Sequence, residues 1–227
     1  MHYAYIVFNA AKLAKKLNIK TISVIEYGVA SGRGLLLLEY YSEEIEKILD
    51  VKIELYGFDM GSGLPTPSSY KDLPYHWKKG FFKMDEENLK SKLKRSKLIL
   101  GDIKETSVDF FSKFTPAPIG AIINDFDFYS STKVSLSMIT KNTNNYLPRV
   151  FCYFDDVIGS EVELYNDYSG ERLAINEFNN ENKSIKFSKA YNLLTPGDEI
   201  WHHQIWYCHI FEHKNYNSFI SKENQNL

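Results

Sequence analysis

Five apolar runs rich in β-branched residues alternate along this chain with segments of helical periodicity, and this alternation is the feature that most restricts its fold. The apolar runs are residues 21–28, 51–59, 96–102, 119–125 and 149–156, and the helical segments are residues 31–50, 85–95, 104–114, 130–146 and 171–181. Strands that alternate with helices form a parallel sheet wrapped by helices on both faces. Strands buried on both faces are continuously apolar, as these are. The sequence therefore predicts an α/β fold.

The two ends of the chain add to this α/β core. Residues 1–20 are predicted to form a short amphipathic helix. Residues 183–192 and 200–215 are predicted to be late strands that pair antiparallel. Because the sequence shows no internal repeat and no linker, we expect one domain over residues 1–227, with an α/β core at 21–215.

Charge and hydropathy argue against several classes of partner. The net charge is -2, from 27 basic and 29 acidic residues, so no basic excess points to nucleic acid or an anionic membrane. No apolar run reaches transmembrane length, and the N-terminus lacks the pattern of a signal peptide. Cys152 and Cys208 lie in apolar strand-like runs and are expected to be free thiols. We expect a cytoplasmic protein that binds neither nucleic acid nor membrane, and the sequence leaves a homo-oligomer open.

A glycine-rich turn, EYGVASGRG, follows the first predicted strand. Gly28, Gly32 and Gly34 have the spacing G-x-x-x-G-x-G, which lets the backbone approach a ligand closely. Glu26 comes two residues before the first of them. The dinucleotide fingerprint G-x-G-x-x-G does not fit, because its third glycine would fall on Leu37, and no phosphate loop follows. A tight strand-to-helix turn without a ligand is the alternative.

Acidic residues end the second and third predicted strands. Asp59 ends the second, where a carboxylate can accept hydrogen bonds from both hydroxyls of a ribose. Asp102 ends the third, where it could accept a hydrogen bond from an adenine amino group or, alternatively, cap the following helix. We favour the ligand in both cases and count the adjacent Ile103 among the cofactor-binding residues.

Together these residues resemble the cofactor signature of class I S-adenosylmethionine-dependent methyltransferases. In that superfamily an acid precedes the glycine turn, as Glu26 does, and another acid closes the second strand, as Asp59 does. The resemblance implies S-adenosylmethionine as the cofactor. It also implies a Rossmann-like, mostly parallel seven-stranded sheet with helices on both faces and a C-terminal antiparallel strand. In such a sheet the fourth and fifth strands are neighbours.

Those neighbouring strands each end in a pair of acids: Asp125 and Asp127 in AIINDFDFYSST, and Asp155 and Asp156 in CYFDDV. Strand alternation places the first pair on one side if the strand continues that far. Four carboxylates this close repel one another unless a cation or a proton intervenes. All-oxygen acidic ligands select a hard ion, Mg²⁺ first, with Ca²⁺ or Mn²⁺ as alternatives. Either pair alone is more often a helix cap, but residues 130–132 are Ser-Ser-Thr and could serve as the cap.

Around these acids the resemblance narrows to the macrocin O-methyltransferase family of sugar and natural-product enzymes. The segments that carry it are DFDFYSST, a following strand that ends FDD, YGFDMGSGLP and SGERLAINEF. The resemblance implies that Asp125, Asp155 and Asp156 bind the metal. It implies that Asp127 is the general base. The chain departs from the family pattern at Asn124, a position that is usually apolar.

The expected function is divalent-metal-dependent methylation of a hydroxyl on a sugar or natural-product small molecule, with S-adenosylmethionine as the methyl donor. A metal lowers the pKa of an alcohol bound to it, and a carboxylate within reach removes the proton. Two alternatives stay open. One is a non-catalytic protein with this fold that binds a nucleoside or a partner. The other is a nicotinamide dehydrogenase, which the glycine spacing disfavours.

Overall fold

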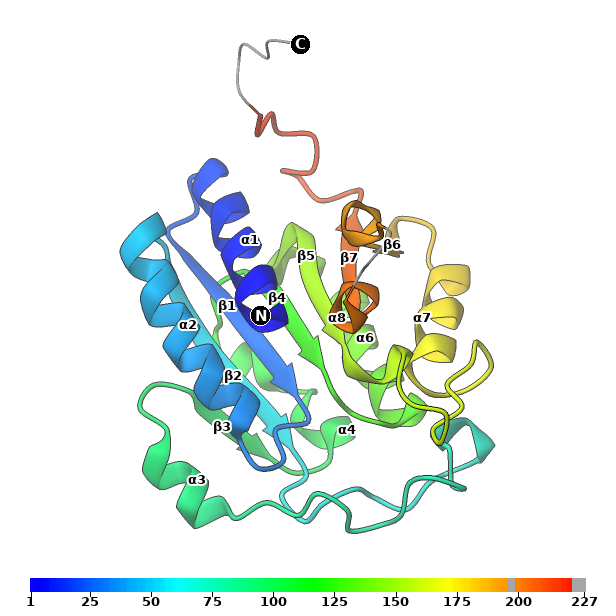
Figure 1. The fold of residues 1–227 in the computed structure, drawn as a ribbon. Coiled ribbons are helices and arrows are strands. Elements are labelled where there is room, and N and C mark those ends of the chain that lie inside the picture. The colour runs from blue at the N-terminus through cyan, green and yellow to red at the C-terminus, as the bar shows by residue number, and fades with distance from the viewer. Residues whose placement is uncertain (196–198, 222–227) are drawn as a thin grey trace.

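Seven strands form one sheet, and five of them run parallel to one another (Figure 1). The strands are β1 (Thr21–Tyr27), β2 (Lys52–Asp59), β3 (Lys97–Leu100), β4 (Ile119–Asn124), β5 (Tyr146–Phe154), β6 (Ile185–Lys189) and β7 (Ile205–Ile210). Their order is β3-β2-β1-β4-β5-β7-β6, and β7 lies antiparallel between β5 and β6. This topology confirms the expected Rossmann-like, mostly parallel sheet and its late antiparallel strands.

The computed structural model describes residues 1–195 and 199–221. Residues 196–198 and 222–227, which the predicted domain of residues 1–227 includes, lie outside the described part. One domain over the whole chain therefore stays a prediction.

Helices cover both faces of the sheet. They are α1 (His2–Lys16), α2 (Arg33–Leu49), α3 (Glu86–Lys92), α4 (Ile103–Thr106), α5 (Phe110–Phe114), α6 (Tyr129–Lys141), α7 (Gly170–Glu181) and α8 (Ile200–His203). On one face α1 and α2 pack through buried residues such as Ile6 and Leu35. On the other face α5, α6 and α7 pack through Phe110, Ile139 and Ile175. Within the described ranges, no helix is long and apolar enough to cross a membrane.

The predicted helix 130–146 is too long. It corresponds to α6, which ends at Lys141, and Tyr146 already begins β5. The backbone leaves the helical region at Asn142 (φ -141°, ψ 36°), and a 3₁₀ turn over Thr143–Asn145 follows. Asn and Thr side chains compete for backbone hydrogen bonds, which makes this run a poor continuation of a helix.

Two further predicted elements are divided in the structure. The predicted helix 104–114 forms two short helices, α4 and α5, with the sequence Ser-Val-Asp at residues 107–109 between them. The predicted strand 200–215 begins as α8 and becomes a strand only in β7. A capping box between Glu199 and His202 stabilises the start of α8, so a helical turn replaces the expected extended chain.

The carboxyl ends of the parallel strands meet at one edge of the sheet, at the lower edge of the view in Figure 1. From β1 the chain enters α2 on one face, whereas from β4 it enters α6 on the other. Neighbouring parallel strands with connections to opposite faces leave a crevice beyond their ends. The long segment 60–85 between β2 and α3 runs along this same edge.

Candidate active site

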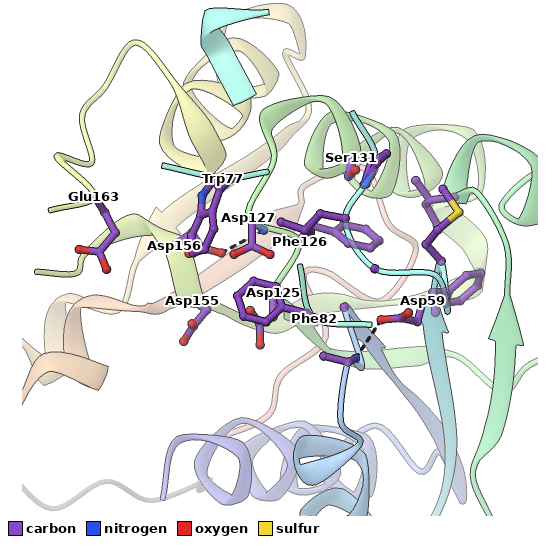
Figure 2. A pocket seen from close by; sticks show the side chains of 18 of the residues that line it. Asp59, Trp77, Phe82, Asp125, Phe126, Asp127, Ser131, Asp155, Asp156 and Glu163 are labelled. Carbon is purple, nitrogen blue, oxygen red and sulfur yellow. Dashed lines mark hydrogen bonds between the residues drawn. The ribbon is translucent and has the colours of Figure 1, made fainter. Parts of the chain in front are cut away.

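A cavity of about 400 Å³ lies at this edge, beyond the ends of β1, β2, β4 and β5 (Figure 2). The predicted site residues that line it are Gly28, Asp59, Asp102, Ile103, Asp125, Asp127, Asp155 and Asp156. The structure therefore brings both halves of the predicted site, the glycine turn and the acids, to one cavity. Glu26, Gly32 and Gly34 are not among the lining residues.

Gly28 follows β1 and packs closely against the backbone of Asp125, the first acid after β4. Its φ is 85°, a conformation that favours glycine, and a Cβ here would lie 1.7 Å from the carbonyl oxygen of Asp125. Its N–H donates to the carbonyl oxygen of Phe58 at 2.9 Å. Gly32, with φ 82°, begins α2 instead, and a Cβ there would collide with Leu89. Of these two glycines, only Gly28 exposes backbone to the cavity.

Glu26 lies behind the glycine turn and is almost completely buried. Its Oε1 accepts a hydrogen bond from the hydroxyl of Tyr3 at 3.2 Å, whereas its Oε2 has no partner in the described part of the chain. Burial raises the pKa of Glu26 to about 8. A Cβ at Gly34 would lie 1.9 Å from Oε1, so a larger residue at this position would require the carboxylate to shift. An unpaired buried oxygen is costly, and a donor on a bound cofactor would satisfy it.

Asp59 holds the end of β2 and faces the cavity. Its Oδ2 accepts the N–H of Ala30 at 2.8 Å, and its Oδ1 accepts the N–H of Gly61. These two bonds fix the carboxylate between the glycine turn and the segment after β2. A carboxylate oxygen can accept more than one hydrogen bond, so the geometry fits the expected bonds from ribose hydroxyls.

Asp102 caps α4, as the alternative interpretation predicted, and it also lines the cavity. Its Oδ1 accepts the N–H of Lys104 at 2.9 Å and thereby caps α4. Asp102 and Ile103 both lie on the cavity wall. The two interpretations of Asp102 are therefore compatible, because the cap occupies only one of its oxygens.

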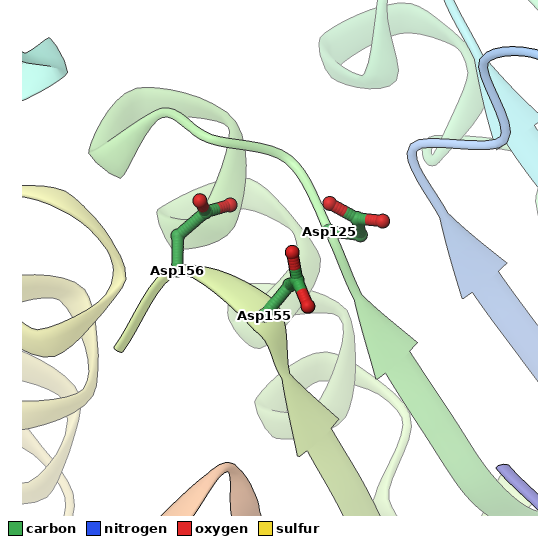
Figure 3. Close-up of side chains that lie close together, drawn as sticks. All are labelled: Asp125, Asp155 and Asp156. Carbon is green, nitrogen blue, oxygen red and sulfur yellow. The ribbon is translucent and has the colours of Figure 1, made fainter. Parts of the chain in front are cut away.

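Three acids form a cluster on the opposite side of the cavity from Asp59. Asp125 follows β4, and Asp155 and Asp156 form the start of a 3₁₀ turn, η3 (Asp155–Val157), that follows β5. One carboxylate oxygen from each lies within 4.8 Å of the others (Figure 3). An all-carboxylate set of three oxygens suits a hard divalent cation such as Mg²⁺, Ca²⁺ or Mn²⁺.

The electrostatics of the cluster favour a cation. Burial, followed by repulsion from Asp155 and Asp156, raises the pKa of Asp125 well above its usual value. Burial and repulsion from Asp155 also raise the pKa of Asp156, to about 7. Both shifts have the same physical meaning: the ionised cluster is unfavourable unless positive charge or protons offset it.

Neighbouring side chains hold two of these carboxylates. The hydroxyl of Tyr153 and the side-chain amide of Gln204 both donate to Oδ1 of Asp155. The hydroxyl of Tyr165 donates to Oδ1 of Asp156. None of the three donors was identified from the sequence, and only the position of Tyr153 at the end of an apolar strand could have suggested one.

Asp127 lies outside the three-acid cluster, although it lines the same cavity; the residue is buried, with 7 % of its surface exposed. β4 ends at Asn124, and Asp127 has φ 59°, in the left-handed region. The expected strand alternation therefore does not apply beyond Asn124. Burial, then Asp156 and Asp155, raise the pKa of Asp127 well above its usual value. Once ionised, a carboxylate with a raised pKa is a stronger base than an ordinary one, which suits the role of proton acceptor expected of Asp127.

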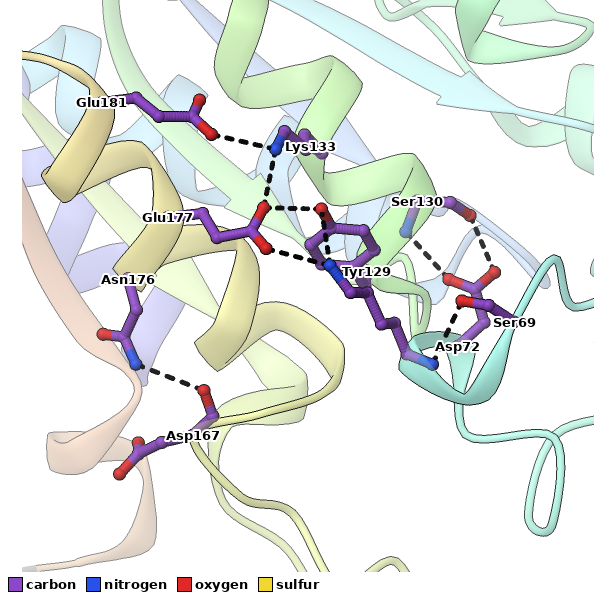
Figure 4. Close-up of polar contacts among 10 residues, drawn as sticks. Ser69, Asp72, Tyr129, Ser130, Lys133, Asp167, Asn176, Glu177 and Glu181 are labelled. Atoms are coloured by element: carbon purple, nitrogen blue, oxygen red, sulfur yellow. Dashed lines mark hydrogen bonds and ion pairs between the residues drawn. The ribbon is translucent and has the colours of Figure 1, made fainter.

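Helix capping does not explain the acids after β4. The N-cap of α6 is Phe128, which has no side-chain cap. Instead, Asp72, from the 3₁₀ turn η1 (Tyr70–Asp72), accepts the N–H of Ser130 at 2.9 Å (Figure 4). The same carboxylate accepts the N–H of Ser68 at 2.8 Å. The cap thus comes from the long segment 60–85 and not from the Ser-Ser-Thr run, which was the candidate cap in the sequence.

The segment 60–85 also covers the cavity. Trp77 and Phe82 line it, and their ring centroids lie 5.7 Å apart. Tyr75 does not line the cavity; its hydroxyl donates to the carbonyl oxygen of Glu163 at 2.7 Å. In η1, Lys71 pairs with Glu177 of α7 at 3.0 Å. The segment is therefore attached at both α6 and α7, and its aromatic residues form one wall of the site.

Comparison with known proteins identifies the fold. No protein-family model matches the chain, and no curated protein matches it in sequence. The solved structure of CalS11, a calicheamicin methyltransferase, has a TM-score of 0.59 at 18% identity, over 88% of this chain and 77% of that one. The O-methyltransferase NovP has a TM-score of 0.57 at 14% identity, over 91% of this chain and 78% of that one. The chain has the fold of class I S-adenosylmethionine-dependent methyltransferases.

Proposed function

We propose that this protein is an S-adenosylmethionine-dependent O-methyltransferase that requires a hard divalent cation, with Mg²⁺ the first choice. The observation that carries the proposal is the shared cavity. It places the glycine turn and the acid of β2 opposite three carboxylate oxygens that lie within 4.8 Å of one another. A methyl donor held on one side thus faces a site that can hold an alcohol on the other.

The chain's residues divide into binding and proton-transfer groups. Gly28, Asp59 and Asp102 would hold the cofactor, which supplies the methyl group. Asp125, Asp155 and Asp156 would hold the cation, which when bound lowers the pKa of the acceptor hydroxyl. Asp127 stands outside this set and takes the proton from that hydroxyl.

Positioning provides the rest of the catalysis. Methyl transfer requires the attacking oxygen, the methyl carbon and the leaving sulfur to lie in line, so a fixed geometry lowers the entropic part of the barrier. The backbone N–H of Ala30 fixes Asp59, and the hydroxyls of Tyr153 and Tyr165 fix two of the cluster acids. Trp77 and Phe82 line the cavity and would shield the reacting groups in part from water.

We further propose that the acceptor is a hydroxyl of a sugar or natural-product small molecule. CalS11, which shares this fold, is a calicheamicin methyltransferase, and NovP is an O-methyltransferase. The aromatic wall and a volume of about 400 Å³ suit a cofactor together with part of a small acceptor.

Calorimetric titration with S-adenosylhomocysteine, with and without Mg²⁺, tests the proposal. We expect binding of the nucleoside, and methyl transfer that stops when the cation is chelated and resumes when it is restored. Absence of nucleoside binding would refute the proposal. Binding without turnover on any hydroxyl acceptor would instead support a non-catalytic protein with the same fold.

A further inference from the structure

A buried asparagine ends β4 directly before the first acid of the cluster. Asn124 is completely buried, and each polar atom of its amide has a partner. Its Nδ2 donates to Oγ1 of Thr132 at 3.0 Å and to Oε1 of Glu171, and its Oδ1 accepts the hydroxyl of Ser135 at 2.7 Å. The last residue of the strand is thereby fixed to α6 and α7 at once.

Glu171 is the second member of this buried arrangement. It lies in the first turn of α7 with no exposed surface, and its two oxygens have different partners. Oε1 accepts from Asn124, and Oε2 accepts the backbone N–H of Asp156 at 2.9 Å. The side chain of Glu171 therefore connects the end of β4 to the turn that follows β5.

A further hydrogen bond links Asp156 back to the chain that follows β4. Oδ2 of Asp156 accepts the backbone N–H of Asp127 at 3.0 Å. A closed circuit results, from Asn124 through Glu171 and Asp156 to Asp127, and the backbone between Asn124 and Asp127 completes it. Asp125 lies within this short stretch, so the circuit restrains the backbone on both sides of it.

We propose that Asn124 and Glu171 are positioning residues of the candidate metal centre, and that their hydrogen bond sets the distance between Asp125 and Asp156. The inference rests on the proposed function, because it presumes that the acids hold a cation. Groups that hydrogen-bond to the neighbourhood of metal ligands commonly change metal affinity by about 10–100-fold when they are removed.

The hydrogen bonds of the circuit need an acceptor at both terminal atoms of the side chain at position 171. The side-chain amide of Asn124 donates to one oxygen and the N–H of Asp156 donates to the other. A glutamine offers one acceptor and one donor group, so it satisfies only one of these two partners. Glu171→Gln thus keeps the size of the side chain and breaks one link of the circuit.

A double substitution reverses the direction of the hydrogen bond between residues 124 and 171, so that residue 171 donates and residue 124 accepts. In the variant Asn124→Asp with Glu171→Gln, the amide of the new glutamine can donate to the new carboxylate, and its carbonyl oxygen can accept from Asp156. The number of carboxylates is unchanged. Thr132 and Ser135 carry hydroxyls that can donate to the new carboxylate. The double variant should therefore restore the geometry that Glu171→Gln disturbs.

Titration of the purified full chain with Mn²⁺, by calorimetry, tests the inference. We expect Glu171→Gln to weaken Mn²⁺ binding by about 10–100-fold and the double variant to return it to nearly the wild-type value. Affinity for S-adenosylhomocysteine should stay constant in all variants. Glu181→Gln is the matched control, because Glu181 lies on the same helix but pairs with Lys133, away from the cluster.

Each outcome decides the inference. Unchanged Mn²⁺ affinity in Glu171→Gln would overturn it, as would a folded double variant that binds Mn²⁺ as weakly as the single one. If Glu171→Gln does not fold, the affinity of the double variant decides alone. A wild-type protein that binds the nucleoside but no Mn²⁺ would refute the metal part of the proposed function, and the inference would fall with it.

Discussion

The backbone N–H of Asp127 donates a hydrogen bond to Oδ2 of Asp156, 3.0 Å away. The bond uses the main chain of Asp127 and leaves its carboxyl group free in the cavity. One residue is thus fixed by its backbone while its side chain remains available. In the proposed function, this arrangement separates the cluster, which would hold a cation, from Asp127, which would accept a proton.

The first prediction concerns that free carboxyl. Asp127→Asn keeps the backbone N–H and the side-chain size but removes the proton acceptor. We expect a loss in kcat of about 10²–10⁴-fold, the usual contribution of a general base. Affinities for S-adenosylhomocysteine and Mn²⁺, measured by calorimetry, should stay within a few-fold of wild type. Turnover close to the wild-type rate would show that another group accepts the proton.

The second prediction concerns the cation. Mg²⁺ that binds only the folded state raises its stability by about 2.7 kcal/mol at a hundred times the dissociation constant. We therefore expect Mg²⁺ to raise the melting temperature of wild type by several degrees, and chelation to reverse the rise. Asp125→Asn should melt higher than wild type without cation, because one repulsive charge is gone, and should lose the response to Mg²⁺. A response equal to that of wild type would exclude Asp125 as a ligand.

The third prediction follows from the burial of Glu26. Its pKa is about 8 in the folded protein, against 4.5 for an unperturbed glutamate. Between these values the folded state holds a proton that the unfolded state has released, so stability falls as pH rises from about 4.5 to about 8. One pKa unit corresponds to about 1.4 kcal/mol, which makes the loss a few kcal/mol.

Melting curves across this pH range, without cofactor, check the effect. Glu26→Gln lacks the titrating group. The difference between its melting temperature and that of wild type should therefore increase from pH 5 to pH 8 and stay constant above pH 8. Glu43→Gln, on the exposed surface of α2, is the control and should follow wild type. Parallel curves for wild type and Glu26→Gln would contradict the prediction.

The fourth prediction concerns the cap on α6. Asp72→Ala removes the acceptor for the N–H groups of Ser130 and Ser68. The loss of a cap typically costs about 1 kcal/mol, and further unpaired donors in this partly buried contact add to it. We expect a destabilisation of about 1–3 kcal/mol in chemical unfolding. The Michaelis constant for the acceptor should also rise, since the segment that carries Trp77 loses its attachment to α6. Glu87→Ala, on the exposed surface of α3, is a control for loss of an acid alone.

The sequence predicts those features that local patterns encode. Apolar runs and helical periodicity predict the five parallel strands, and the acids at strand ends predict which residues meet at the cavity. The cap on α6 was beyond such patterns, because Asp72 acts on Ser130 from 58 residues away. The hydrogen bond between Asn124 and Glu171 could not be predicted either, because no local sequence pattern indicates that two residues on separate elements are in contact.

The last prediction concerns the charge of the acceptor. Among the described residues that line the cavity there is no Lys, Arg or His, whereas acids occur on every side of it, including Glu163 at its rim. A divalent cation would offset only part of this negative charge. A pyrophosphate group would find no cationic side chain there, so we expect a neutral or aminated glycoside to compete for the site better than the nucleoside diphosphate form of the same sugar.

Inhibition of methyl transfer by three matched compounds checks this: a methyl glycoside, its amino-sugar counterpart and the nucleoside diphosphate sugar. Glu163→Gln should weaken inhibition by the amino sugar several-fold and leave that of the neutral glycoside unchanged. Glu161→Gln is the matched control, because Glu161 is exposed and does not line the cavity. Strongest inhibition by the nucleoside diphosphate sugar would contradict the prediction, because it would require positive charge that the side chains lining this cavity do not supply.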